Sequence, residues 1–242
     1  MKKLLIILFL LFAQPVFALT LTVYPDPDPE TTSVDGNVQA ADNATWSVIH
    51  DATTGPGGSD SATDSWIIAS LDTGNYKIAR GFILFDTSAI PDGSTIDSAT
   101  VRLTNNSTSN ADTNNYSLGI VASSPASNTA IVAGDYDNFT VHSDTVFGSI
   151  DLTAFIDNAS HTITINASGL AVIDKAGVTK YGIRLSGDYN ETAGHGGAPG
   201  GQNETQVRMS ETAGTDSDPQ LTITYTVPGG AVAKKKILID ND

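Results

Sequence analysis

The chain has 242 residues, of which 12 are basic and 27 acidic, a formal net charge of −15, and it has no cysteine. Charged residues make up only 16% of the chain, against about 25% in an average soluble domain, so serine, threonine, asparagine and glycine supply most of the polar surface. This composition excludes disulfide-stapled scaffolds and thiolate or cysteine-metal chemistry. It also argues against coiled coils and nucleic-acid binding, because neutralising phosphates needs clustered lysine and arginine.

Residues 1–18 have the pattern of an export signal. Lys2 and Lys3 precede an apolar run over 4–13, and Val16 and Ala18 offer the residues that a cut after Ala18 requires. The run is too short to span a bilayer, which needs about 20 residues, so we expect no membrane insertion after cleavage. Removing two lysines leaves 10 basic against 27 acidic residues, a net charge of −17. The prediction is a protein that is secreted or held at the cell surface.

Short runs of apolar and β-branched residues recur along the mature chain between glycine, proline and asparagine turns. Their period of two and their length predict strands at 19–24, 46–49, 66–69, 76–85, 99–103, 117–121, 162–165, 178–185, 206–209 and 221–227. Two short helices are expected at 152–158 and 168–174, the second with Ser168 as N-cap and Gly177 as its stop. Many short strands without βαβ alternation predict an all-β sandwich or barrel over 19–227, followed by a tail over 228–242.

The strand at 76–85 carries bulky apolar residues on both faces from Phe82 onward, which is typical of a central strand covered on both sides. Turn residues at Pro91, Asp92 and Gly93 follow it and indicate a hairpin with the strand at 99–103. We therefore expect the side chains of Phe82, Leu84, Val101 and Leu103 to fill one core.

Residues 80–103 combine a strand that ends in Phe85-Asp86, a Pro-Asp-Gly turn and a strand that begins Ala-Thr-x-x-Leu at Ala99. This stretch resembles the central signature of the DNRLRE-domain proteins, which are related to the family-96 carbohydrate-binding modules. Residues 218–225 are similar to the closing strand of these domains, and residues 24–36 and 177–185 resemble segments of secreted relatives. The resemblance implies a jelly-roll, a two-sheet antiparallel β-sandwich, often secreted and sometimes appended to polysaccharide-degrading enzymes or surface proteins.

Catalytic motifs are absent from the sequence. It contains no Gly-x-Ser-x-Gly elbow, no His-Glu-x-x-His pair and no phosphate loop, and its histidines, His50, His142, His161 and His195, lack ligand spacing. No pair of carboxylates stands out as the acid and base of a glycosidase. We expect a protein without catalytic activity; a polysaccharide lyase or hydrolase is the enzymatic alternative.

Acidic residues next to the first and last predicted strands suggest a metal site. Asp26, Asp28 and Glu30 alternate with prolines that hold the chain extended, and Asp216 and Asp218 precede the last strand. The first and last strands of a jelly-roll are often neighbours, so the two groups are expected to meet. Together they offer oxygen ligands of the kind that Ca²⁺ takes, roughly six to eight per ion. The sequence therefore predicts a structural calcium site; solvated turn residues are the alternative.

Carbohydrate binding needs exposed aromatic faces with amides and carboxylates around them. Trp46 follows a polar turn and is the better platform of the two tryptophans, because Trp66 heads an apolar run and is expected in the core. Two further turns place an aromatic residue among polar acceptors. The predicted ligand-binding residues are Trp46, Tyr136, Asp137, Tyr189 and Asn190.

These observations lead to two functional hypotheses. The first is a secreted, non-catalytic β-sandwich that binds a polysaccharide or a cell-surface glycan. The second is a structural or adhesive protein of a cell surface, an appendage or a virion. In the second hypothesis the tail at 228–242, which joins three lysines to the apolar run Ile237-Leu-Ile239, mediates self-association.

Overall fold

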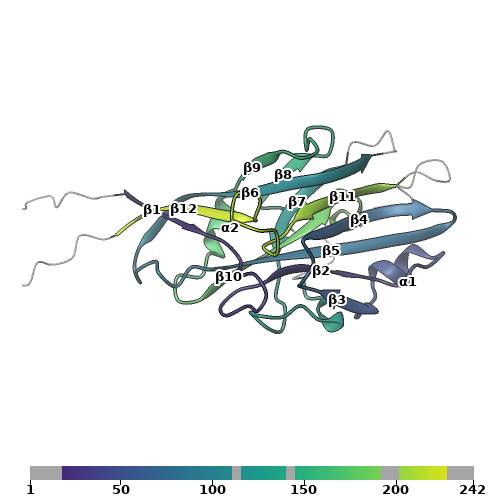
Figure 1. The fold of residues 1–242 in the computed structure, drawn as a ribbon, viewed down its shortest axis with the longest axis horizontal. Coiled ribbons are helices and arrows are strands. Elements are labelled where there is room, and N and C mark those ends of the chain that lie inside the picture. Colours follow the sequence, from purple (N-terminus) through teal and green to yellow (C-terminus); the bar gives the residue numbers. More distant parts are fainter. Residues whose placement is uncertain (1–17, 111–115, 140–144, 192–201, 228–242) are drawn as a thin grey trace, which may run out of the picture.

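The computed structural model describes residues 18–110, 116–139, 145–191 and 202–227; the predicted signal sequence before Ala18, the tail, His142 and His195 lie outside these ranges. The strands are β1 (Ala18–Val23), β2 (Asp35–Gln39), β3 (Gly57–Ser59), β4 (Asp64–Asp72), β5 (Asn75–Asp86), β6 (Thr95–Asn110), β7 (Ser117–Ala122), β8 (Gly148–Asp151), β9 (Ser160–Thr164), β10 (Val178–Leu185), β11 (Asn203–Arg208) and β12 (Gln220–Thr226). The helices are α1 (Trp46–His50), α2 (Ala167–Ala171), α3 (Ser186–Tyr189) and the short 3-10 turn η1 (Ala133–Asp135). Figure 1 shows their arrangement.

The described strands form one antiparallel network that curls on itself, which confirms the all-β prediction. The long strand β6 organises one side of it: β12 and β9 pair with the two edges of its first half, and β11 pairs with its second half. β1 pairs with β12 over its full length, with Ala18 opposite Thr226. β12 therefore pairs with the first half of β6 and β11 with the second half. Residues 209–219, which connect β11 to β12, lie outside the sheet.

The strand β5 organises the other side and separates two apolar cores. It pairs with β2, β4 and β10, and successive side chains of a strand point to opposite faces. Ile83 and Phe85 belong to the larger core, together with residues of β6, β10 and β12. Phe82 and Leu84 belong to a smaller core on the opposite face, together with residues of β2, α1 and the segment around η1. The prediction that β5 is covered on both faces is confirmed.

The prediction that β5 and β6 form a hairpin with one shared core is wrong. The turn itself forms, since the Ser94 amide donates to the Pro91 carbonyl at 3.1 Å, but β5 and β6, both fully described, share no ladder. β5 pairs with β2, β4 and β10, and β6 pairs with β9, β11 and β12. Residues 87–94 therefore connect two strands that are not neighbours in the sheet. Val101 and Leu103 therefore lie in the larger core, apart from Phe82 and Leu84, although all four are buried.

Three local predictions also differ from the structure. Residues 46–49 form the helix α1 rather than a strand. Residues 152–158 contain turns instead of a helix, with Leu152 and Phe155 anchored in the core. In α2 the N-cap is Asn166, whose Oδ1 accepts a hydrogen bond from the Gly169 amide at 3.1 Å, rather than Ser168. Polar turn residues of this kind can cap a helix from more than one position.

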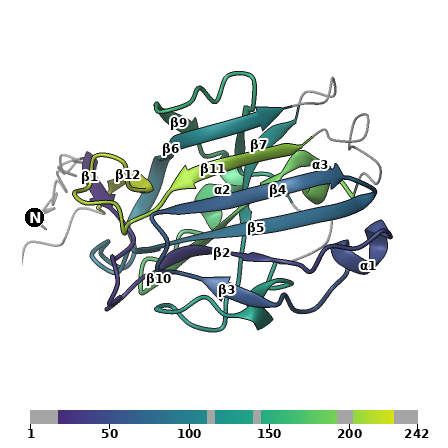
Figure 2. The same cartoon turned by 45° about the vertical axis from the view of Figure 1, so that its right-hand side comes forward.

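The two ends of the molecule differ in what they carry. β1 and β12 lie side by side at one end, and α1 lies at the opposite end, in both Figure 1 and Figure 2. None of the helices in the described part of the chain has the length and apolar composition needed to cross a membrane.

Candidate functional site

Trp46 begins the helix α1 and packs against the edge of the smaller core. Its ring stacks on the His50 ring with centroids 5.3 Å apart and planes 22° apart, and it meets the Tyr76 ring edge-on at 5.3 Å. The buried side chain of Ile49 packs in the smaller core and holds the helix α1 against it. Trp46 itself remains partly exposed, so the structure places it at the surface, as a ligand-binding platform requires.

The neighbours of Trp46 hold it in one orientation. The His50 ring lies 2.7 Å from Asp51 Oδ1 through Nδ1 and 3.2 Å from the Asp188 carbonyl through Nε2. A backbone bridge joins Asn43 to Tyr76, where the Tyr76 amide donates to the Asn43 carbonyl at 2.7 Å. A ring that is already ordered loses little conformational entropy when a ligand binds.

Charged and amide groups lie at the start of β5, next to Tyr76, which contacts Trp46. Lys77 Nζ donates to Asp72 Oδ2 at 2.9 Å and lies 3.9 Å from Asp42 Oδ2, and Gln202 Nε2 donates to Asp72 at 3.4 Å. The hydrogen bond with Asp72 raises the pKa of Lys77, and the hydrogen bond from Lys77 lowers the pKa of Asp72. An aromatic surface with donors and acceptors at its border suits a ligand rich in hydroxyl groups.

The other predicted ligand-binding residues are not part of this surface. Tyr136 is fully buried, and its hydroxyl donates to the Ile49 carbonyl at 2.8 Å. Tyr189 is also buried, so neither ring offers a face to a sugar, contrary to the prediction. Asp137 is partly exposed and lies 3.8 Å from a buried guanidinium, and Asn190 is exposed at the end of α3. A sequence cannot separate these buried tyrosines from exposed ones, because both kinds stand among the same polar turn residues.

Trp66 also departs from its prediction. It is partly exposed rather than in the core, because the neighbouring Ile67 takes the inward-facing position of β4.

A buried ion cluster lies beneath the Trp46 surface and was not predicted. Arg80 of β5 binds the Asp188 carboxylate in a bidentate manner, with both N–O distances 2.9 Å, and Arg184 of β10 binds the same carboxylate at 2.6 Å. Arg80 also donates to the carbonyls of Tyr136 and His50. Burial of Asp188 by itself would raise its pKa, but the charges of Arg184 and Arg80 hold that pKa well below its usual range. The cluster ties β5, β10, α1 and η1 together.

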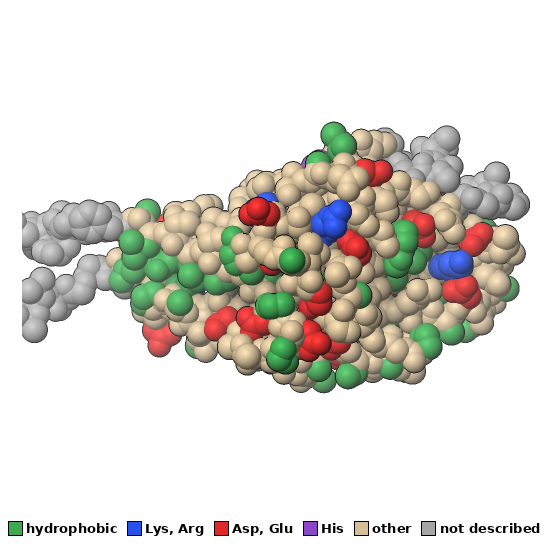
Figure 3. All heavy atoms as spheres, in the orientation of Figure 1, with side chains coloured by type: hydrophobic (Ala, Val, Ile, Leu, Met, Phe, Trp, Pro, Cys, Tyr) green, Lys and Arg blue, Asp and Glu red, His purple; other side chains and the backbone are tan. Residues whose placement is uncertain are grey.

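A cavity of about 350 Å³, with Glu211 and Asp218 in an otherwise largely apolar lining, lies where the loop at 24–34 meets the connection at 209–219. Pro25 and Pro27 line one side, and residues 210–215 with Asp218 line the other. The pairing of β1 with β12 brings these loops together, as the sequence predicts. Acidic side chains gather below the centre of the face shown in Figure 3.

The predicted calcium ligands have different surroundings. Asp26 Oδ2 accepts four hydrogen bonds, two each from Thr31 and Thr32, at 2.7 to 3.0 Å. Partial burial by itself would raise the pKa of Asp26, but the hydrogen bonds from Thr31 and Thr32 lower it overall. Asp28 and Asp216 are exposed, Glu30 is partly exposed, and Asp218 is buried against the cavity. Within the described residues, no three acidic or histidine side chains already stand in a metal-ligating arrangement.

Two acidic residues outside the predicted set also belong to this region: Glu211 lines the cavity, and Asp35 binds the lining residue Ser210. Asp35 is fully buried and accepts hydrogen bonds from the amide and hydroxyl of Ser210 at 3.0 and 2.9 Å. Burial, and then the charge of Glu211, raise the pKa of Asp35 well above its usual value. Burial also raises the pKa of Glu211, and it raises that of Asp218 to about 6. Their burial depends on the meeting of two distant loops, which the sequence pattern does not reveal.

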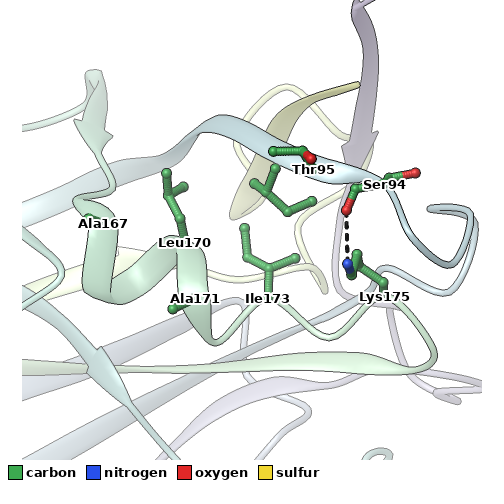
Figure 4. A pocket seen from close by; sticks show the side chains of 8 residues that line it. Ser94, Thr95, Ala167, Leu170, Ala171, Ile173 and Lys175 are labelled. Carbon is green, nitrogen blue, oxygen red and sulfur yellow. Dashed lines mark hydrogen bonds between the residues drawn. The ribbon is translucent and has the colours of Figure 1, made fainter. Parts of the chain in front are cut away.

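A second hollow, an open groove of about 470 Å³, lies between the start of β6 and α2 (Figure 4). Ile96, Leu170 and Ile173 give it an apolar floor, and Lys175 Nζ at its rim donates to the Ser94 carbonyl at 2.8 Å. Its lining is mostly apolar and offers no convergent set of catalytic groups.

Comparison of the sequence with models of known protein families, and with curated proteins, finds no match.

Proposed function

We propose that this chain is a secreted, non-catalytic β-sandwich of jelly-roll type that binds a polysaccharide. The observation that carries the proposal is the partly exposed Trp46 ring, held by His50 and Tyr76 on a rigid surface. Tryptophan rings stack on the apolar faces of sugars, and the polar end of β5 supplies partners for the hydroxyl groups.

The overall charge narrows the class of polysaccharide. At a formal net charge of −17 for the secreted chain, with 10 basic and 27 acidic residues, the protein repels polyanions over the range of a Debye length. A neutral glycan, or one that carries amino groups, fits this surface better than a sulfated or uronate-rich chain.

The strand pairing supports the jelly-roll part of the proposal. β1, β12, β6 and β9 form one set of ladders, and β5 with β2, β4, β10, β7 and β8 forms another. Both sets contribute to the larger core. Two antiparallel layers around one core are the architecture of such sandwiches.

A glycan array followed by titration with the best glycan tests the proposal. We expect the Trp46→Ala variant to lose about tenfold or more in affinity, because stacking contributes on the order of 1–2 kcal/mol. Trp66→Ala is the matched control, since Trp66 is the other tryptophan, is also partly exposed and lies on β4 rather than on α1. Circular dichroism of both variants checks that they fold. Equal losses in the two variants, or no glycan bound by the wild type, would contradict the proposal.

A structural or adhesive role is the second candidate, and the edge of the sheet at β1 favours it. β1 pairs only with β12 among the described strands, and Leu19 on it is 45% exposed. An open strand edge is a site for adding a strand of another chain. Light scattering of the mature protein with and without residues 228–242 tests this role, and a monomer in both forms at high concentration would count against it.

A further inference from the structure

We infer that the cavity between the loops at 24–34 and 209–219 binds a calcium ion, with the carboxylates of Asp218 and Glu211 as its side-chain ligands. The inference is independent of the proposed glycan binding at Trp46. It also replaces the ligand set that the sequence predicts, because only Asp218 is common to the two sets.

The unsatisfied oxygen atoms of the cavity carry the inference. Asp218 is only 3% exposed and lines the cavity, and its Oδ1 accepts no hydrogen bond from the described residues. Glu211 Oε2 is likewise buried without a hydrogen bond from them. A buried carboxylate oxygen that lacks a partner costs several kcal/mol of desolvation. A cation in the cavity removes this cost at both atoms.

The charges around the cavity are strongly unbalanced. Glu211 and Asp218 are the acidic residues of its lining. Further carboxylates act on these two electrostatically, Glu30 on Glu211 and Asp216 on Asp218, and both lining carboxylates act on Asp35. Among the described residues, Arg102 is the basic side chain whose charge acts on Asp218. Its Nη2 already donates to the carbonyls of Thr215 and Asp218, at 2.8 and 3.3 Å. The Arg102 guanidinium thus stabilises the connection at 209–219 and is the positive charge that acts on Asp218, whereas Glu211 is stabilised by hydrogen bonds, including one from the Ser210 hydroxyl.

Asp26 and Asp35 support the loops around the cavity without binding the ion. Asp26 Oδ2 is occupied by Thr31 and Thr32, which fold the loop, and Asp35 is occupied by Ser210. The Ser210 hydroxyl also donates to the Asp26 carbonyl at 3.0 Å, which joins the two loops. Backbone carbonyls and water complete the coordination, because Ca²⁺ takes roughly six to eight oxygens in irregular geometry.

Two side-chain carboxylates make a weak site. Affinity for Ca²⁺ rises with the number of charged ligands, and extracellular modules bind it with dissociation constants of about 10⁻⁴ to 10⁻³ M. Mg²⁺ demands near-octahedral geometry and keeps its waters, so it is expected to bind less well.

The test is a calcium titration of the mature protein by calorimetry, together with thermal melts after chelation and after calcium is added. Wild type should bind calcium and melt at a higher temperature with it. Asp218→Asn and Glu211→Gln should each weaken binding by about tenfold, since each removes one charged ligand. Asp218→Asn should also raise the melting temperature of the chelated protein, because it removes a buried charge without changing the shape of the side chain.

Two controls keep the inference falsifiable. Asp216→Asn removes a neighbouring but exposed carboxylate and should leave the calcium response unchanged. Sodium chloride at matched ionic strength measures simple screening of the acidic surface. A full calcium response in Asp218→Asn, a response that salt reproduces, or an equal response to magnesium would overturn the inference.

Discussion

The substitution Asp188→Asn tests whether the buried ion cluster holds the fold together. The asparagine keeps the shape of the side chain but removes the negative charge, so two guanidinium groups that are each 1% exposed lose the carboxylate they share, and Arg80 keeps the more distant Asp137 at 3.8 Å. Breaking a buried ion pair from one side typically costs about 3–5 kcal/mol. This is a large part of a typical unfolding free energy of about 5–15 kcal/mol.

The assay is urea unfolding followed by tryptophan fluorescence and circular dichroism, with the loss read from the midpoint at an unchanged slope. Asp72→Asn is the matched control, because Asp72 binds Lys77 at 2.9 Å near the surface, where solvent screens an ion pair and its loss changes stability little. If Asp188→Asn costs no more than Asp72→Asn, the argument from burial is refuted.

A second set of substitutions separates charge from packing. Replacing Arg80 and Arg184 by methionine and Asp188 by leucine removes all three charges and should recover part of the lost stability. Recovery should be incomplete, because Arg80 also satisfies the carbonyls of Tyr136 and His50.

Two further substitutions test local packing and loop folding. Gly182→Ala should destabilise the protein by about 1–3 kcal/mol, because the added Cβ would lie 2.3 Å from the Phe139 ring; an unchanged urea midpoint would contradict this. Asp26→Ala should cost about 1–2 kcal/mol near neutral pH, since it removes four hydrogen bonds to a carboxylate. The pKa of Asp26 is lowered in the folded protein, so its contribution is present above the unfolded value near 3.8 and is lost as the pH falls through the folded pKa. The difference between wild type and Asp26→Ala in chemical unfolding should therefore shrink below about pH 3.8, and a constant difference would refute this assignment.

The strands that the sequence reveals are those with strong apolar patterning. β5, β10 and β12 carry unbroken or alternating apolar residues and lie close to their expected bounds. β2 and β3 have the sequences DGNVQ and GGS, which have little strand propensity. Their extended form depends on pairing with β5 and with each other, so it comes from tertiary contacts.

The candidate sites were only partly predictable for the same reason. Trp46 stands out because it follows a polar turn, and the meeting of the two acidic loops follows from neighbouring first and last strands. Which carboxylates are free depends on their partners: Thr31 and Thr32 occupy Asp26, whereas Glu211 and Asp218 are buried with an oxygen atom unsatisfied. Such partners become visible only when residues about 180 positions apart, such as Asp26 and Ser210, lie together.

The pairing of β1 with β12 also determines how the molecule can be attached to something larger. Both strands reach the same end of the body, while α1 with Trp46 lies at the far end (Figure 2). A tether joined at either terminus would leave from the side remote from the tryptophan. The domain can thus be displayed on a surface, or inserted into another polypeptide, with the end that carries α1 and Trp46 pointing outward.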